Sequence, residues 1–192
     1  MRTINIILVC FLFVLMTASY SGAADEISTG IIPKPSIEKQ GKGFFKIGAK
    51  SYILFSQKDY EIERLAGYFA NEINKVLLNP EPPAIKYEPL GSSKNTIAIS
   101  IDKSNSYLGS EGYSLEISES NVKISAMDYR GLFYGIQTFL QILRINFSEM
   151  PCVHIEDSPK YKWRGMLLDC SRHFMTTDFI KRYIDFLAFY KM

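Results

Sequence analysis

Residues able to do chemistry gather near the carboxyl end of the chain. Arg164 offers a guanidinium, Asp169 a carboxylate and His173 an imidazole, within one short stretch. A guanidinium presents planar, paired donors that a carboxylate or two neighbouring hydroxyls can accept. On residue type alone, Arg164 is expected to be a structural arginine paired with a carboxylate. A lone histidine such as His173 is more often a hydrogen-bonded structural residue than an acid–base group.

The cysteines and histidines lack the spacing of a metal site. His154 and His173 have no Cys-x-x-Cys or His-x-x-x-His companion, so neither a metal nor a cofactor is expected. Cys152 and Cys170 have two possible states. They form a disulfide, which an oxidising compartment permits, or they are two separate buried thiols, which the apolar run beside Cys170 favours.

A strand, a polar turn and a helix are predicted around the candidate residues. Residues 166–168 are continuously apolar, as in a strand buried on both faces. The helix over residues 178–190 has Thr177 as its cap, and its apolar face is formed by Phe179, Ile180, Tyr183, Ile184, Leu187 and Ala188. This is the first unit of a parallel α/β architecture. One such unit cannot cover its own strand, so we expect an exposed apolar stripe on this helix and a second domain that is cut off.

Two earlier helices are predicted from apolar residues at helical spacing. The first follows Ser56-Gln57-Lys58-Asp59, where the Ser56 hydroxyl can cap it, and ends at Asn79-Pro80. The second follows Asp128 as its cap. Each helix has one apolar face that needs a partner, which predicts that both lie on one face of a sheet.

The sheet is expected to be mostly antiparallel. Residues 113–117 and 122–126 alternate apolar and polar side chains around Glu119-Ser120-Asn121, which predicts a hairpin. Gly41-Lys42-Gly43 indicates a turn. Further strands are expected at residues 44–47, 52–55, 84–87 and 96–101. Asp157-Ser158-Pro159 is interpreted as a hinge, and the carboxylate pair Glu156-Asp157 as a solvated linker.

Length, charge and the first residues limit the class of protein. The chain has 192 residues and a net charge of +2, from 22 Lys and Arg against 20 Asp and Glu, with no basic block. Nucleic acid is therefore not an expected partner. A complete (β/α)₈ barrel needs about 250 residues. Residues 1–24 have the positive start, apolar run and small residues of a signal peptide, which predicts export to the periplasm or medium and no membrane span after cleavage.

Three segments resemble glycoside hydrolase family 20, the β-N-acetylhexosaminidases. Residues 163–174, continuing through 179–185 to 191–192, are similar to the first strand and helix of its catalytic barrel. Residues 31–35 resemble the opening strand of its N-terminal domain, and residues 131–138 that domain's second helix. The expected fold is α+β, a mostly antiparallel sheet with two helices on one face, followed by the first βα unit of a truncated (β/α)₈ barrel. The expected domains are residues 25–157 and 158–192.

The resemblance implies hydrolysis of terminal, non-reducing N-acetylhexosamine from glycans with retention of configuration. In this family the substrate's own acetamido oxygen is the nucleophile, assisted by an Asp and a Glu on a His-x-Gly-Gly-Asp-Glu motif. The only Asp-Glu dipeptide here is Asp25-Glu26, outside any such motif, so no catalytic residue is expected in this chain. Arg164 matches the arginine that grips the terminal sugar. Asp169 and His173 are expected to contact the sugar-binding residues rather than the sugar itself.

Two functions from different classes therefore stay open. The chain is the N-terminal part of an exported β-N-acetylhexosaminidase and is inactive by itself. Alternatively, it is an autonomous exported α+β module that binds glycan or protein without catalysis. The exposed stripe expected on residues 178–190 favours the first. The sequence leaves open the oligomeric state and the preference between glucosamine and galactosamine.

Overall fold

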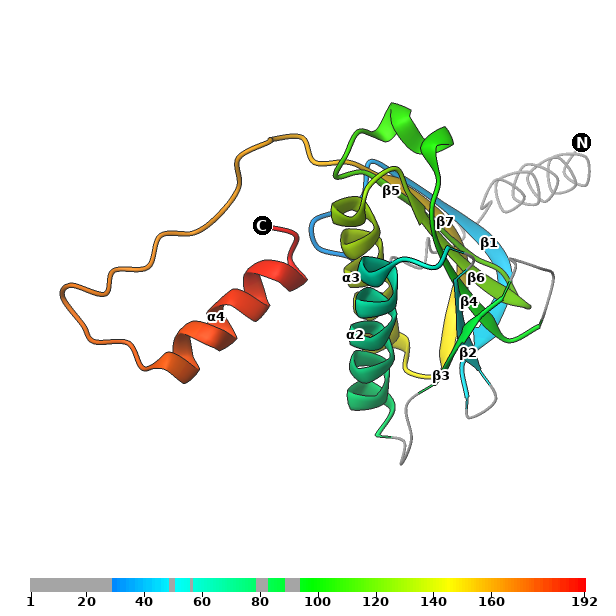
Figure 1. The fold of residues 1–192 in the computed structure, drawn as a ribbon, viewed down its shortest axis with the longest axis horizontal. Helices are drawn as coiled ribbons and strands as arrows, with labels where there is room; N and C mark the ends of the chain where they lie inside the picture. Colours follow the sequence, from blue (N-terminus) through cyan, green and yellow to red (C-terminus); the bar gives the residue numbers. More distant parts are fainter. Residues whose placement is uncertain (1–28, 49–50, 56, 79–82, 89–93) are drawn as a thin grey trace, which may run out of the picture.

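The computed structural model describes residues 29–48, 51–55, 57–78, 83–88 and 94–192 (Figure 1). The predicted signal peptide lies outside these ranges. No helix in the described ranges is long and apolar enough to cross a membrane. The elements are, in chain order, β1 (Ile37–Lys46), β2 (Tyr52–Phe55), α2 (Tyr60–Leu77), β3 (Ala84–Tyr87), β4 (Thr96–Ile101), the 3₁₀ helix η1 (Lys103–Leu108), β5 (Tyr113–Ile117), β6 (Asn121–Ala126), α3 (Tyr129–Asn146), β7 (Glu149–Asp157) and α4 (Thr177–Phe189).

The described strands form one mixed sheet in the order β1-β7-β5-β6-β4-β2-β3. β1, β7, β5 and β6 pair antiparallel, and the predicted hairpin is confirmed as β5 and β6. β6, β4, β2 and β3 pair parallel. The sheet is therefore mixed rather than mostly antiparallel. In the second half, the crossover through α2 brings the chain back in the same direction, which a hairpin cannot do.

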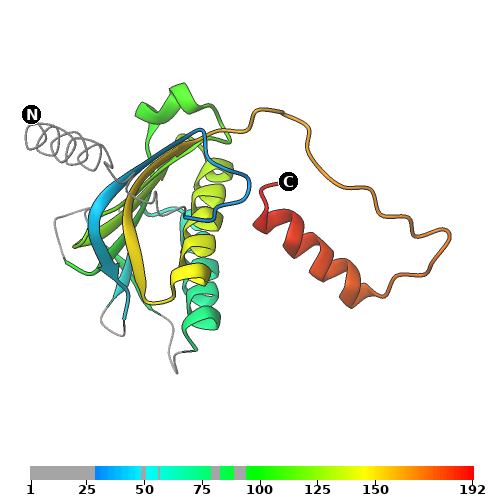
Figure 2. The same cartoon turned by 180° about the vertical axis from the view of Figure 1, so that it is seen from behind.

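α2 and α3 cover the same face of the sheet, as predicted (Figures 1 and 2). Their apolar residues pack on the inward-facing residues of the strands in one buried core. Phe69 of α2 meets Phe139 of α3 edge to face, with ring centroids 5.1 Å apart. On the other face of the sheet, the alternate residues of β5 and β6 include the exposed Glu116 and Lys123.

Carboxylates cap both helices. Asp59 caps α2 and accepts a hydrogen bond from the backbone N–H of Glu61 at 2.8 Å. The capping residue is thus Asp59, the last of the four residues predicted to begin this helix. Ser56, the predicted cap, lies outside the described residues. Asp128 caps α3 as predicted. A carboxylate in this position accepts backbone N–H groups that have no partner within the helix.

The glycines predicted to form a turn form a bulge inside β1. β1 pairs with β7 on both sides of this point, and the register shifts between Gln40 and Phe44. Gly43 has a φ of +90°, which few other residues adopt without strain. A Cβ at Gly41 would lie 3.1 Å from Cβ of Cys152 on β7. The glycines therefore permit two extra residues in β1, where residues 41–43 face Cys152 alone, and a close approach between the two paired strands.

Strand β7 was not predicted from the sequence, and its presence changes the interpretation of the Glu156-Asp157 pair and of Cys152. Glu156 and Asp157 end this strand between β1 and β5, so they are not a solvated linker. Cys152 lies buried within β7, whereas Cys170 is exposed, and both are free. The disulfide, one of the two states left open, does not form, and the favoured alternative of two buried thiols is correct for Cys152 alone. The two residues belong to different parts of the molecule, the sheet and the segment that leaves it.

Residues 158–192, here named the C-terminal arm, extend away from the sheet and return through α4 (Figures 1 and 2). No strand forms at residues 166–168, where Leu167 is 95% exposed. A strand needs a neighbour for its backbone groups, and no described strand lies beside this run. α4 is capped by Thr176, one residue before the predicted cap. It contains no buried residue, in agreement with the expected exposed stripe.

Candidate functional site

Arg164 lies where the C-terminal arm passes the α/β domain, which we define as residues 29–157. Its Nη1 donates to Oε2 of Glu111 at 3.0 Å and to the carbonyl of Tyr161 at 2.6 Å. Its Nη2 donates to the Tyr134 hydroxyl at 3.3 Å, and its Nε donates to the carbonyl of Lys191 at 2.9 Å. Four of its five N–H donors thus have partners in the part of the chain that the structure describes. The guanidinium is paired with a carboxylate, as residue type alone predicted.

A cavity of about 390 Å³ opens beside this arginine. It lies between the segment before β1, the end of β7 and the start of the arm, and its wall includes Ser36, Asp157, Tyr161 and Arg164. Donors and acceptors therefore line one small space, a composition suited to hydroxyl-bearing ligands. Using Arg164 to hold a sugar requires its guanidinium to exchange Glu111 and the Tyr161 carbonyl for hydroxyl groups.

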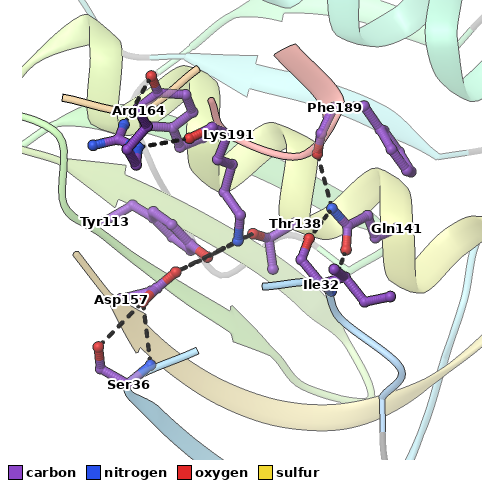
Figure 3. Close-up of polar contacts among 10 residues, drawn as sticks. Ile32, Ser36, Tyr113, Thr138, Gln141, Asp157, Arg164, Phe189 and Lys191 are labelled. Atoms are coloured by element: carbon purple, nitrogen blue, oxygen red, sulfur yellow. Dashed lines mark hydrogen bonds and ion pairs between the residues drawn. The ribbon is translucent and has the colours of Figure 1, made fainter. Parts of the chain in front are cut away.

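A buried lysine that no sequence motif singles out, Lys191, lies next to Arg164. Nζ of Lys191 lies 3.1 Å from the Thr138 hydroxyl, 3.3 Å from the Tyr113 hydroxyl and 3.4 Å from Oδ2 of Asp157 (Figure 3). Burial lowers the pKa of Lys191, and the Asp157 carboxylate partly offsets this. Burial also raises the pKa of Tyr113 well above its usual value, with a further contribution from Asp157.

Gln141 of α3 joins the two ends of the described chain. Its amide nitrogen donates to the carbonyl of Ile32 at 2.9 Å and to the carbonyl of Phe189 at 2.8 Å, and its oxygen accepts from the N–H of Ile32 at 2.8 Å (Figure 3). The side chain is 4% exposed. A buried amide with these three partners is well satisfied, and it fixes the end of α4 against α3.

Asp169 and His173 lie elsewhere on the arm. Asp169 accepts from the backbone N–H of Ser171 at 2.9 Å and from that of Arg172 at 3.2 Å. These two bonds lower the pKa of its carboxyl group. Asp169 also forms an ion pair with Arg172, and His173 is exposed. The structure therefore does not bring either residue to Arg164, and their supporting role stays a prediction.

The residues that the sequence missed belong to β5, α3, β7 and the end of the chain. Tyr113, Thr138 and Asp157 are far apart in sequence, so no local spacing joins them to Lys191. The sequence does contain one indication that Asp157 ends a strand. Val153 and Ile155 alternate with polar neighbours, as in a strand with one wet face, and this pattern continues to the residues interpreted as a linker.

Residues 28–158 match the family model described as glycosyl hydrolase family 20, domain 2, and residues 161–192 match that of the family's catalytic domain. The chain belongs to glycosyl hydrolase family 20. The resemblance stated from the sequence is thereby confirmed, and so is the predicted fold class of an α+β domain followed by the start of a barrel.

Curated family 20 relatives are longer than this chain. The beta-hexosaminidase of Porphyromonas gingivalis is 30% identical over 198 residues, which cover 96% of this chain and 25% of the relative. That of Vibrio furnissii is 28% identical over 171 residues, covering 88% of this chain and 26% of the relative. The chain therefore spans about a quarter of the length of these two relatives.

Solved family 20 structures are similar over most of this chain. The β-N-acetylhexosaminidase of Streptomyces coelicolor has a TM-score of 0.72 and 29% identity, covering 84% of this chain and 33% of that one. The exo-β-N-acetylglucosaminidase of Vibrio harveyi, solved in complex with N-acetylglucosamine, has a TM-score of 0.69 and 25% identity, covering 84% of this chain and 24% of that one.

Proposed function

We propose that this chain is the N-terminal part of an exported β-N-acetylhexosaminidase that removes terminal, non-reducing N-acetylhexosamine from glycans. The observation that carries the proposal is the order of the two family matches, domain 2 over residues 28–158 and the catalytic domain over residues 161–192. Relatives named beta-hexosaminidase, and a solved relative that holds N-acetylglucosamine, support this substrate class.

The proposed reaction is substrate-assisted and retaining. The 2-acetamido oxygen of the sugar attacks its own anomeric carbon, a Glu protonates the leaving oxygen, and an Asp orients the acetamido group. Because nucleophile and carbon belong to one molecule, the reaction avoids the entropy cost of a bimolecular encounter. The Asp-Glu pair is not in a matching motif here, so residues 1–192 supply binding and positioning groups but no catalytic acid.

Arg164 is the residue of this chain that we assign to the sugar. Its forked donors fit two adjacent hydroxyls of a terminal ring, and the Glu111 carboxylate pairs with it at 3.0 Å in the structure. Sugar binding at Arg164 requires the sugar to displace the charged Glu111 carboxylate, which costs free energy. The paired hydrogen bonds between the guanidinium and two sugar hydroxyls, made in one plane, supply the favourable free energy of binding.

Sequencing the gene beyond the codon for Met192, and expressing the complete reading frame, tests the proposal. We expect the frame to continue through a His-x-Gly-Gly-Asp-Glu motif, and its product to release nitrophenol from a nitrophenyl N-acetyl-β-glucosaminide. The 192-residue chain is expected to give no release above blank. A stop codon after Met192, or an inactive complete product, would instead favour the binding module. Turnover by the 192-residue chain would contradict the missing catalytic acid.

Export is a separate part of the proposal. Residues 1–24 combine Arg2, an apolar run and small residues before Asp25, the layout of a cleaved signal. We expect the protein outside the cytoplasm to begin at Asp25, as measured by N-terminal sequencing or intact mass. A cytoplasmic protein that keeps residues 1–24 would contradict export and leave the hydrolase proposal unaffected.

A further inference from the structure

We propose that Lys191 is the positioning residue that docks the C-terminal arm on the α/β domain, by placing its ammonium among three oxygen atoms of that domain. These atoms are the hydroxyls of Tyr113 and Thr138 and Oδ2 of Asp157, and together we name them the oxygen socket. The inference goes beyond the proposed hydrolysis. It concerns how the segment matched to the catalytic domain is held, whatever reaction that domain performs.

The geometry of the oxygen socket matches an ammonium group. Three oxygens lie between 3.1 and 3.4 Å from Nζ of Lys191, and an ammonium has three N–H donors and no acceptor. The other protons fit without conflict. The Tyr113 hydroxyl donates to Asp157 at 3.2 Å, and the Thr138 hydroxyl, in contact with Tyr113, donates to it. Every polar group in the cluster therefore has a partner.

The oxygen socket belongs to the α/β domain, and the ammonium comes from the arm. Tyr113 is on β5, Thr138 on α3 and Asp157 at the end of β7, whereas Lys191 follows α4. The contact thus joins the segment matched to domain 2 with the segment matched to the catalytic domain. A buried ammonium is unfavourable unless it is paired and hydrogen-bonded, and Lys191 is 7% exposed. The socket therefore selects one position for the end of the arm.

The oxygen socket remains satisfied without the lysine. Oδ1 of Asp157 accepts from the N–H and the hydroxyl of Ser36, at 3.1 and 3.2 Å. Oδ2 keeps the hydrogen bond from Tyr113. Loss of Lys191 therefore does not leave the carboxylate without partners, and the α/β domain is expected to stay folded. This separates docking of the arm from stability of the domain.

Contacts at one end hold α4 in place. The carbonyl of Phe189 accepts from Gln141, and the carbonyl of Lys191 accepts from Arg164. α4 has 13 residues, none of them buried, and an undocked helix of this length is marginal in water. Once the end of the arm leaves its socket, α4 is expected to unfold locally. Its amide protons then report docking directly.

Hydrogen exchange on Lys191→Met tests the proposal, because methionine keeps the unbranched apolar part of the side chain and removes its three donors. We expect the amides of α4 to exchange about tenfold faster or more, and those of β5 and β6 to keep their protection. Lys181→Met is the matched control, since Lys181 is exposed on the same helix. Unchanged protection of α4 in Lys191→Met would overturn the proposal. So would an equal loss in β5 and β6, because that indicates general destabilisation.

Asp157→Asn provides a second, independent test. The amide oxygen can still accept from Ser36, but an NH2 group then replaces the acceptor Oδ2 and Lys191 loses its counter-charge, so we expect α4 to exchange faster than in the parent chain. In the double variant with Lys191→Met, the increase should not exceed that of the larger single change. Additive increases would show that the two residues act separately, which would overturn the socket as one unit.

Discussion

Lys191 and Tyr113 share one buried site, and burial moves their pKa values in opposite directions. The folded pKa of Lys191 lies below the usual 10.5, chiefly because burial disfavours the ammonium, and that of Tyr113 lies above the usual 10.0 because burial disfavours the phenolate. Between the lowered pKa and 10.5, the unfolded chain therefore binds more protons at Lys191 than the folded chain does. The contribution of Lys191 to stability rises with pH over this window.

Because the contribution of Lys191 to stability rises with pH, the free energies of unfolding of the parent chain and of Lys191→Met should differ more as pH rises. Urea unfolding measured from about pH 7 to pH 10 should show the free energy of unfolding of the parent chain rising relative to the variant. Tyr113 is present in both chains and opposes the trend only above about pH 10, so the comparison isolates Lys191. A difference that stays flat or falls over this range would contradict the lowered pKa.

Arg164 carries a prediction for a protein that includes the rest of the catalytic domain. We expect Arg164→Ala to lower kcat/KM by about 10- to 100-fold, the size expected when charge-assisted hydrogen bonds are lost. Glu111→Gln is the matched control, because it removes the carboxylate paired with Arg164 in the structure and keeps the arginine. Equal losses in both variants would show that the ion pair matters and sugar binding does not.

At the scale of elements, what the sequence predicted well was local. The helical spacing of Ile62, Leu65 and Phe69, and the alternation in β5 and β6, depend on neighbours a few residues away, and the structure confirms those elements. The pairing of strands that lie far apart in the sequence could not be predicted from such local patterns. β7 was missed, and the turn expected at residues 41–43 is a bulge that only its partner strand explains.

The candidate site shows the same division. Arg164 could be selected from its side chain and from its place in a family motif, whereas its pairing with Glu111 depends on how the arm folds back. The oxygen socket depends on three elements meeting at one point. Residues 166–168 were predicted to be a strand because their apolar run requires buried faces, and no described neighbour provides them. The apolar side chains of residues 166–168 indicate that this run is buried in some context, but they do not show which strands would lie beside it.

The two helices that cover the sheet are joined at their N-terminal ends, which gives a prediction for the corrected cap. Asp59 caps α2, and its Oδ2 accepts from the Tyr129 hydroxyl at the start of α3 at 3.0 Å. Asp59→Ala should lower the free energy of unfolding by about 1 kcal/mol, the usual cost of losing a cap. Tyr129→Phe removes the bridge alone and should cost less. Thermal unfolding of both, beside the exposed Glu63→Ala as control, checks this, and equal losses from Asp59→Ala and Glu63→Ala would exclude a capping role.

At the scale of the whole molecule, a closed domain carries an arm with uncovered apolar side chains. Trp163 and Leu167 are each 95% exposed and Phe174 is 90% exposed, whereas the core residues beneath α2 and α3 are almost fully buried. Isolated exposed apolar residues are common, but three large ones along one short segment indicate a surface that another part of a protein covers. The match of this segment to the catalytic domain is consistent with that interpretation.

Shortening the chain separates the two parts. A chain that ends at Ser158 keeps the sheet, α2, α3 and the bonds from Ser36 and Tyr113 to Asp157, so it should still unfold cooperatively in urea. It should bind less of the hydrophobic dye ANS than the 192-residue chain, because the exposed side chains of the arm are gone. Replacing Leu167 and Phe174 by Ser in the full chain is the matched control and should lower dye binding without shortening. Stronger dye binding by the shortened chain would mean that the arm covers the domain core, and the division of the molecule proposed here would then be wrong.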